Sequence, residues 1–155
     1  MLRQWSKEDE QAVRGAMAAT RVEALAERLL DELSGGQRQR VWIAMVLAQE
    51  TPILLLDEPT TYLDIVHQIE LLELLAELNR QGRTIVAVLH DLNQACRYAS
   101  HLIALRDGAI VAQGAPAAIF TEALVEQVFG LASVIIRDPV SGTPLMVPKG
   151  RIDPA

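Results

Sequence analysis

The stretch that decides the fold is residues 52–64, PILLLDEPTTYLD. It holds the apolar run Ile53–Leu56 between Pro52 and Pro59, with no alternation of polar and apolar residues. The two prolines leave room only for a strand, and an unalternating run is typical of a parallel strand that is buried on both faces. The stretch therefore predicts a short parallel strand that ends in the acidic pair Asp57-Glu58.

The residues that follow predict a strand–helix–strand unit. A helix is expected from Asp64 to Arg80, closed by Gly82. Its inner stripe comprises Ile65, Ile69, Leu72, Leu75 and Leu78. The apolar run Thr84–Leu89 predicts a second strand. Strand, helix and strand in this order form a right-handed crossover in a parallel sheet.

Residues 1–50 are predicted to be helical. Ser6-Lys7-Glu8-Asp9 has the S-x-x-[DE] form of a helix start, and the predicted helix covers residues 6–19. A second helix is expected to carry Leu25, Leu29 and Leu33 on one face. Gly35 and Gly36 interrupt the pattern, and a third helix is expected over residues 37–49, with Val41, Ala44, Leu47 and Ala48 facing inward.

The remainder of the chain predicts a helix over residues 92–99, a hairpin and a last helix over 121–129. The hairpin is indicated by Asp107-Gly108, which joins two apolar runs. A Pro- and Gly-rich tail follows, with one apolar run over residues 134–136. The predicted organisation is thus a helical region over 1–50, an α/β core over 51–130 and a tail over 131–155.

Composition narrows the class of protein. Half of the 155 residues are hydrophobic and 22% are charged, which is typical of a soluble globular chain. The net charge of -6 argues against a dedicated nucleic-acid binder. The single cysteine, Cys96, cannot form an internal disulfide. No signal core and no apolar stretch near ~20 residues is present, so we expect a cytoplasmic chain that meets a membrane only through partners.

Polar residues follow both predicted strands at the edge where parallel sheets bind ligands. Asp57 is predicted to hold a magnesium ion, directly or through water, and Glu58 to accept a proton from an attacking water. His90, after the second strand, is predicted to donate to a terminal phosphate oxygen. The alternatives are that Asp57 caps the strand end, that Glu58 is solvated surface and that His90 is a satisfied polar residue.

The stretch LSGGQRQR, residues 33–40, predicts an anion site at a helix start. Ser34 suits an N-cap, and Gly35 and Gly36 let the backbone approach a ligand. A helix start carries roughly half a positive charge, so an anion is stabilised there without a lysine. The only lysines, Lys7 and Lys149, are not in a G-x-x-x-x-G-K-[ST] loop. The alternative is an ordinary turn that caps a helix.

Taken together and in this order, these motifs resemble the ATP-binding subunit of ABC transporters. The resemblance makes residues 33–37 the signature motif, residues 53–57 the Walker B strand and Glu58 the catalytic glutamate. It places Tyr62-Leu63-Asp64 in the D-loop and makes His90 the switch histidine. The sequence of residues 57–75, 90–114 and 138–148 is most similar to that of importers of iron(III)-siderophore complexes, with cobalamin and haem importers as near relatives.

The resemblance implies an α/β fold: the C-terminal part of a P-loop NTPase domain. A helical-subdomain remnant would be followed by parallel strands with flanking helices and a terminal hairpin. A Walker A loop is not among these residues, which implies a gene fragment, a split subunit or a misplaced start. ATP and Mg²⁺ are the implied cofactors. Two ATPase subunits pair head to tail in this family, so the resemblance implies that Ser34, Gly35, Gly36 and Gln37 serve a partner's ATP. Asp57, Glu58 and His90 would instead need a Walker A loop in their own domain. Asp64 of the D-loop is implied as a further nucleotide-binding residue.

The resemblance also implies transmembrane permease partners, which choose the substrate, and a peripheral position on the inner face of the membrane. An ABC-type ATPase is implied, but the isolated chain is expected to be inactive. One alternative is a non-catalytic module that supplies LSGGQ and a pairing surface to a complete ATPase. Translation factors and DNA-repair proteins with ABC domains are another, which long heptad arrays or a duplicated ATPase would support; the sequence shows neither.

Overall fold

The computed structural model describes residues 5–61 and 63–150. The chain divides into two compact units, Met1–Val88 and Leu89–Ala155, which are described in turn. The predicted boundaries after residues 50 and 130 stay predictions. Within the described ranges, no helix has the length and apolarity needed to cross a membrane.

Two capped helices open the first unit. Helix α1 (Lys7–Thr20) starts at Ser6, whose Oγ accepts a hydrogen bond from the Asp9 N–H at 3.1 Å while the Asp9 carboxylate accepts one from the Ser6 N–H at 2.9 Å. This capping box confirms the predicted helix start. Helix α2 (Gly35–Leu47) starts at Ser34. The prediction that the two glycines interrupt the helical pattern is wrong, because both lie in the first turn of α2.

The segment between α1 and α2 differs from the prediction of one more helix. It forms two short 3-10 turns, η1 (Glu23–Leu25) and η2 (Leu30–Glu32). Of the three leucines expected on one face of a helix, Leu33 is buried, whereas Leu29 is 71% exposed. A short helix is marginal unless an apolar face packs against something, and here the leucines share no such face.

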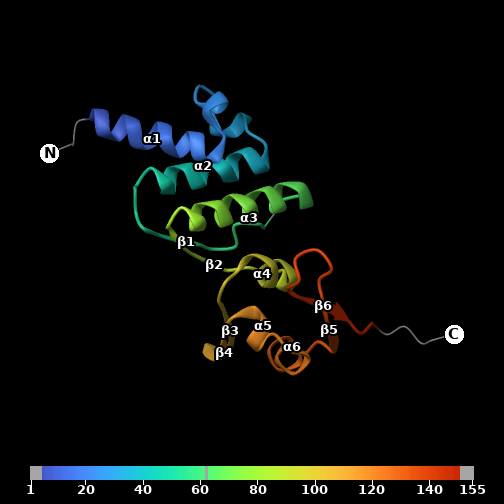
Figure 1. Ribbon diagram of the computed structural model, residues 1–155. Coiled ribbons are helices and arrows are strands. Elements are labelled where there is room, and N and C mark those ends of the chain that lie inside the picture. The colour runs from blue at the N-terminus through green and yellow to red at the C-terminus, as the bar shows by residue number, and fades with distance from the viewer. Residues whose placement is uncertain (1–4, 62, 151–155) are drawn as a thin grey trace. The chain divides into compact units, whose positions relative to one another are not determined.

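The predicted strand–helix–strand unit is confirmed. Strands β1 (Ile53–Leu56) and β2 (Thr84–Ala87) pair in parallel, with Ile53 opposite Thr84 and Leu56 opposite Ala87. Helix α3 (Ile65–Arg80) joins them, and α2 lies between α1 and α3 (Figure 1). One core binds these elements; it includes Ile43, Ala44 and Leu47 of α2, Leu54 of β1, and Leu71, Leu75 and Leu78 of α3.

Two expectations about burial in this unit are wrong. Strand β1 is not buried on both faces: Leu54 is fully buried, but Leu55 is 73% exposed, because within the described residues the helices pack against one face of the sheet. Ile65 does not join the inner stripe of α3 and is 62% exposed. It begins the helix, about 9 Å along the axis from Leu71, the first α3 residue in the core.

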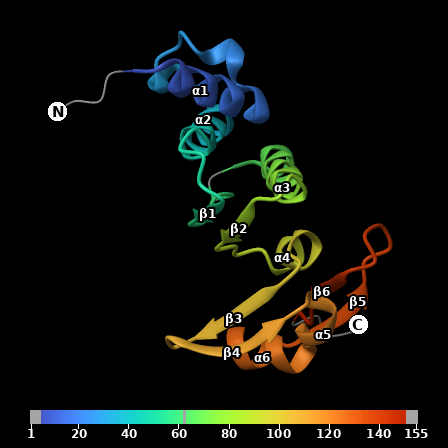
Figure 2. The same cartoon turned by 60° about the vertical axis from the view of Figure 1, so that its left-hand side comes forward.

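The second unit starts with α4 (Leu92–Tyr98) and the hairpin of β3 (Leu102–Arg106) and β4 (Ala109–Gly114), which Figure 2 shows as a long ribbon. The turn residues Asp107 and Gly108 have φ of 51° and 77°. Positive φ at both positions is what a tight hairpin turn requires, so the predicted hairpin is confirmed. Helices α5 (Pro116–Ile119) and α6 (Glu122–Phe129) follow.

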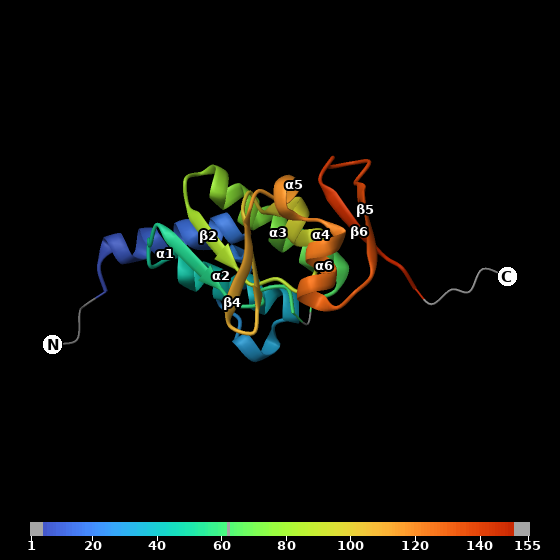
Figure 3. The same ribbon diagram turned by 90° about the horizontal axis from the view of Figure 1, so that it is seen from below.

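The predicted tail contains a second hairpin that the sequence analysis missed. Strands β5 (Ser133–Arg137) and β6 (Pro144–Pro148) pair antiparallel (Figure 3). The Asp138 carboxylate accepts hydrogen bonds from the N–H groups of Val140 and Ser141 in the turn. Asn93 of α4 donates to the Met146 carbonyl at 3.1 Å and accepts from its N–H at 2.7 Å. These long-range bonds anchor β6 to α4.

Candidate functional site

The start of α2 has the form that the anion-site prediction requires. Ser34 Oγ accepts a hydrogen bond from the Gln37 N–H at 3.3 Å, and Gln37 Oε1 accepts one from the Ser34 N–H at 3.1 Å. The Ser34 hydroxyl proton is not used in either bond, because the oxygen is the acceptor. The first-turn N–H groups of a helix have no intrahelical acceptor. This end of α2 therefore offers a hydroxyl and backbone amides to an anion.

Gly36 lies in close contact with α3. It is buried, and a Cβ atom added to it would lie 2.4 Å from His67 Cδ2 and 3.0 Å from His67 Nε2. A Cβ added to Gly35 would have no atom of another segment within 4 Å. The two glycines therefore have different roles: the backbone at Gly35 is open to a ligand, and Gly36 lets the imidazole approach the helix start.

Asp64 caps α3 and holds the same imidazole. One carboxylate oxygen, Asp64 Oδ1, accepts hydrogen bonds from the His67 backbone N–H at 2.9 Å and from His67 Nδ1 at 2.8 Å. The backbone N–H and then the imidazole keep the pKa of the Asp64 carboxyl below its ordinary value. The structure thus joins two groups of predicted site residues, the Ser34–Gln37 segment and Asp64, through a histidine.

Sequence reasoning missed His67. Hydrophobic periodicity assigns it no place, because it lies outside the apolar stripe of α3. The available signal was the spacing Asp64-x-x-His67 at a predicted helix start, which brings an N-cap side chain and the third helical residue together. That spacing does not reveal Gly36, which is 31 positions earlier in the sequence. Tyr62, the first residue of the predicted D-loop, lies outside the described residues.

Asp57 and Glu58 follow β1 as predicted, and both are exposed. Glu58 has φ of 46°, in the left-handed region, although it precedes Pro59. Left-handed φ is unfavourable for a residue with a Cβ, and a following proline restricts the backbone further. Thr61 holds this turn by donating its N–H to the Glu58 carbonyl at 3.1 Å and its hydroxyl to Glu58 Oε2 at 3.2 Å.

The residues at this strand end fit magnesium only as a partial ligand set. Asp57 offers an exposed carboxylate directly after the strand. Among the residues that the structure describes, no three His, Cys, Asp or Glu side chains gather as a metal cluster. Magnesium commonly takes one or two protein carboxylates and completes its shell with water and substrate phosphates. Asp57 is therefore suited to hold an ion that arrives with a nucleotide.

His90 belongs to the second unit, where it directly precedes Asp91, the N-cap of α4. The Asp91 carboxylate accepts hydrogen bonds from the N–H groups of Asn93 at 2.9 Å and Gln94 at 3.0 Å. The side chain of His90 is exposed. Its predicted role toward a phosphate oxygen stays a prediction.

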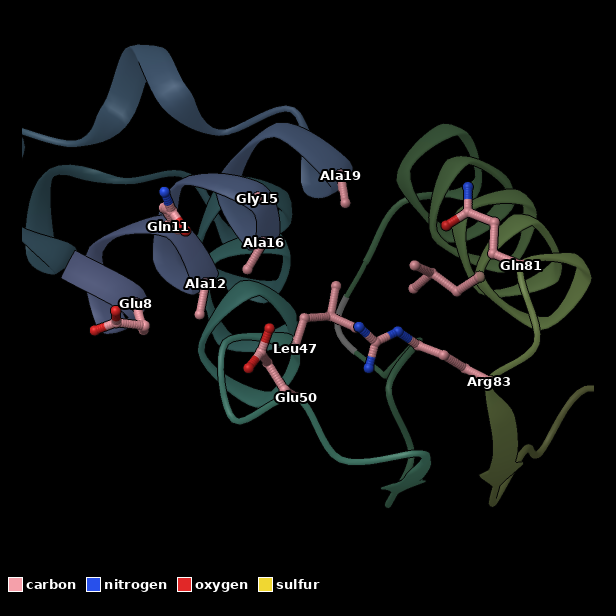
Figure 4. Close-up of a pocket in the computed structure, with 11 residues that line it drawn as sticks. Glu8, Gln11, Ala12, Gly15, Ala16, Ala19, Leu47, Glu50, Gln81 and Arg83 are labelled. Atoms are coloured by element: carbon pink, nitrogen blue, oxygen red, sulfur yellow. The ribbon is translucent and has the colours of Figure 1, made fainter. Parts of the chain in front are cut away.

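A hollow of about 530 Å³ in the first unit contains none of the predicted site residues (Figure 4). Small and apolar residues of α1, α2 and α3, among them Ala16, Leu47 and Leu78, form part of its lining. Glu8, Glu50 and Arg83 contribute charge, and Arg83 donates a hydrogen bond to the Thr51 carbonyl at 2.9 Å. The candidate site is therefore the surface formed by the α2 start and the α3 start, and not this hollow.

Known proteins are similar to this chain in sequence. The family model described as "ABC transporter" matches residues 2–61. The ferric enterobactin transport ATP-binding protein FepC of Escherichia coli (strain K12) is 69% identical over 97% of this chain and 56% of its own length. The siderophore transport system ATP-binding protein YusV of Bacillus subtilis (strain 168) is 61% identical over 97% of this chain and 55% of its own length. The chain thus spans about half the length of the curated relatives it matches.

Solved structures agree with the sequence matches. A metal-chelate type ABC transporter in an inward-facing conformation has a TM-score of 0.88 and 30% identity, and it covers 97% of this chain and 61% of its own. An ATP-binding cassette solved as a dimer with ADP and Pi has a TM-score of 0.61 and 35% identity, over 74% of this chain and 50% of its own. The predicted P-loop NTPase fold class is confirmed, and the chain belongs to the family of ABC transporter ATP-binding domains.

Proposed function

We propose that this chain is part of the ATP-binding, ATP-hydrolysing subunit that energises an ABC importer of iron(III)-siderophore complexes. The importer assignment is supported by relatives whose names state ferric enterobactin transport and achromobactin transport, at 69% and 60% identity. In this proposal the chain lies at the inner face of the membrane and reaches it through permease subunits. The permeases select the siderophore.

The observation that carries the proposal is the geometry at the start of α2. Ser34 and Gln37 close the capping box, and Gly35 leaves the adjacent backbone uncovered. A hydroxyl proton and first-turn amides at a positive helix end match the oxygens of a nucleotide phosphate. We infer that Ser34, Gly35, Gly36 and Gln37 contact an ATP molecule that a second ATPase subunit holds.

The residues at the strand ends would act on a different ATP molecule, one gripped by a Walker A loop of their own domain, and no such loop lies within these 155 residues. Asp57 would hold the magnesium ion that accompanies ATP, and Glu58 would accept the proton of the attacking water. General-base assistance of this kind is typically worth about 100-fold to 10,000-fold in rate. His90 would donate to a terminal phosphate oxygen, and Asp64 would lie at the contact between the paired subunits.

A nucleotide titration tests which chain grips the ATP. Within these 155 residues neither lysine lies in a phosphate-binding loop. Titration of the chain with a fluorescent ATP analogue and magnesium should therefore show weak or no binding. Tight magnesium-dependent binding would contradict the claim that the nucleotide is gripped mainly by a Walker A loop, which these residues do not include.

A mixing experiment separates a chain that pairs from an inert chain. The chain is added to a complete ATPase relative, and ATP hydrolysis is followed as a function of chain concentration. A chain that pairs through its signature segment changes the rate, and Ser34→Ala should weaken that effect. If the rate does not change at any concentration, pairing through this segment is excluded. The catalytic role of Glu58 is tested separately, with Glu58→Gln in an assembly whose own domain supplies the phosphate-binding loop.

A further inference from the structure

His67 lies between the two segments that the proposed function brings to the ATP. Its imidazole contacts Gly36 through the Cδ2–Nε2 edge and Asp64 through Nδ1. Because a carboxylate only accepts hydrogen bonds, the neutral ring must carry its proton on Nδ1 in this arrangement. The ring orientation is therefore set by Asp64 at one end and limited by the α2 backbone at the other.

A second contact holds the two helices together along the same line. One turn beyond Gly36, the Arg40 guanidinium forms an ion pair with Glu70, one turn beyond His67, at 2.5 Å. The Arg40 side chain is mostly buried, at 19% exposure. The ion pair fixes α2 beside α3 without involving the imidazole. A displacement of the ring is then transmitted to the nearby α2 start, because the rest of α2 is held in place.

We propose that His67 is a positioning residue that couples Asp64 to the Ser34–Gln37 segment. Asp64 Oδ1 accepts both His67 hydrogen bonds. A group that approaches Asp64 competes for this oxygen and so weakens the hydrogen bond that holds the imidazole. The ring edge then moves against Gly36, where no Cβ separates it from the helix backbone. In this way pairing at Asp64 adjusts the amides that meet the phosphate. This inference rests on the proposed function for its role but not for its test.

Amide hydrogen exchange of the 155-residue chain, without nucleotide, tests the coupling. Asp64→Asn keeps a capping side chain but removes the negative charge from the imidazole bond. It should change exchange at Gln37 and Arg38, whose N–H groups donate to the Ser34 hydroxyl and carbonyl, by roughly threefold to tenfold, the size that one hydrogen bond contributes. The same substitution in a His67→Phe background, which keeps a ring but no donor, should change these amides less than twofold, by about the experimental scatter.

Two further variants serve as controls. Glu70→Gln removes the ion pair one turn away and should leave the response of the Gln37 amide to Asp64→Asn intact. His67→Asn places an amide N–H near the position of Nδ1 and should partly restore the response that His67→Phe abolishes. Exchange in α1 serves as the measure that each variant is folded.

The tautomer gives an independent readout. The ¹⁵N spectrum of the imidazole should place the proton on Nδ1 in the wild type, and Asp64→Asn should reduce that population. A proton on Nε2, or an equal response at Gln37 in wild-type and His67→Phe backgrounds, overturns the coupling. If the mixing experiment fails while the exchange response is found, the proposed function fails and the coupling stands. The reverse result leaves the proposed function and removes the role of His67.

Discussion

The contact between Gly36 and His67 makes two adjacent glycines respond oppositely to the same substitution. A Cβ at position 36 would lie 2.4 Å from His67 Cδ2, about 1 Å inside ordinary van der Waals contact. A ring displacement of that size would also stretch the 2.8 Å bond from Nδ1 to Asp64 beyond hydrogen-bond range. A Cβ at position 35 meets nothing within 4 Å.

The magnitude follows from three terms. Overpacking costs about 1–3 kcal/mol and loss of the hydrogen bond costs about 1 kcal/mol, while alanine in place of glycine in a helix gains up to about 1 kcal/mol. Gly36→Ala should therefore destabilise the fold by about 1–3 kcal/mol when the propensity gain is fully realised. Gly35→Ala, which has only the propensity term, should stabilise it by up to about 1 kcal/mol.

Urea unfolding followed by far-ultraviolet circular dichroism measures both effects. The decisive background is His67→Ala, where the ring is gone and Gly36→Ala should become neutral or stabilising. The coupling energy between positions 36 and 67 should be about 2–4 kcal/mol, because without the ring only the propensity gain remains. An equal rise of the unfolding midpoint for both glycine substitutions would refute the clash with His67. So would a loss of stability from Gly36→Ala that persists without the imidazole.

Four further outcomes are expected. Glu58→Gly should stabilise the fold by about 1 kcal/mol in urea unfolding, because it relieves the left-handed φ of 46°. The control Glu73→Gly, on the exposed side of α3, should cost about 1 kcal/mol of stability. A loss of stability at both positions would contradict the backbone strain at Glu58. Glu58→Gln, in an assembly that holds ATP, should bind nucleotide but trap it unhydrolysed between subunits; unchanged turnover removes Glu58 from the role of base. Burial raises the pKa of the Cys96 thiol to about 11, and the residue is 1% exposed. Iodoacetamide at pH 8 should therefore alkylate this thiol far more slowly in the native chain than in urea. Equal alkylation rates would refute its burial. The N–H groups of Val140 and Ser141 lower the pKa of the Asp138 carboxyl from its ordinary 3.8. The wild type should therefore lose stability as pH falls below that value, and Asp138→Asn should lose less stability over the same range. Identical profiles of stability against pH for the two proteins would contradict this contribution of Asp138.

Local rules predicted the element boundaries because their causes lie within a few residues. The capping box at Ser6, the cap at Ser34 and the turn at Asp107-Gly108 all depend on hydrogen bonds or φ angles that neighbouring side chains determine. The same rules failed for the three leucines between α1 and α2. Their spacing is helical, but helix formation there would need a packing surface that the described structure does not provide.

The candidate site divides in the same way. The motif residues Ser34–Gln37, Asp57 and Glu58 could be named from the sequence because glycines, caps and acidic pairs are local signals. His67 could not, since its importance arises from contact with Gly36, 31 positions away. The second hairpin was missed for a related reason: β6 is held by Asn93 of α4, 53 positions from Met146.

The sequence by itself determined the parallel strand–helix–strand unit, the first hairpin and the family, because periodicity, turn chemistry and ordered motifs are properties of short segments. Only the tertiary structure decided which face of β1 is covered, that the second of two adjacent glycines meets an imidazole, and that one carboxylate holds that imidazole in place. These features depend on distances between segments far apart in the chain, and no local preference encodes such distances.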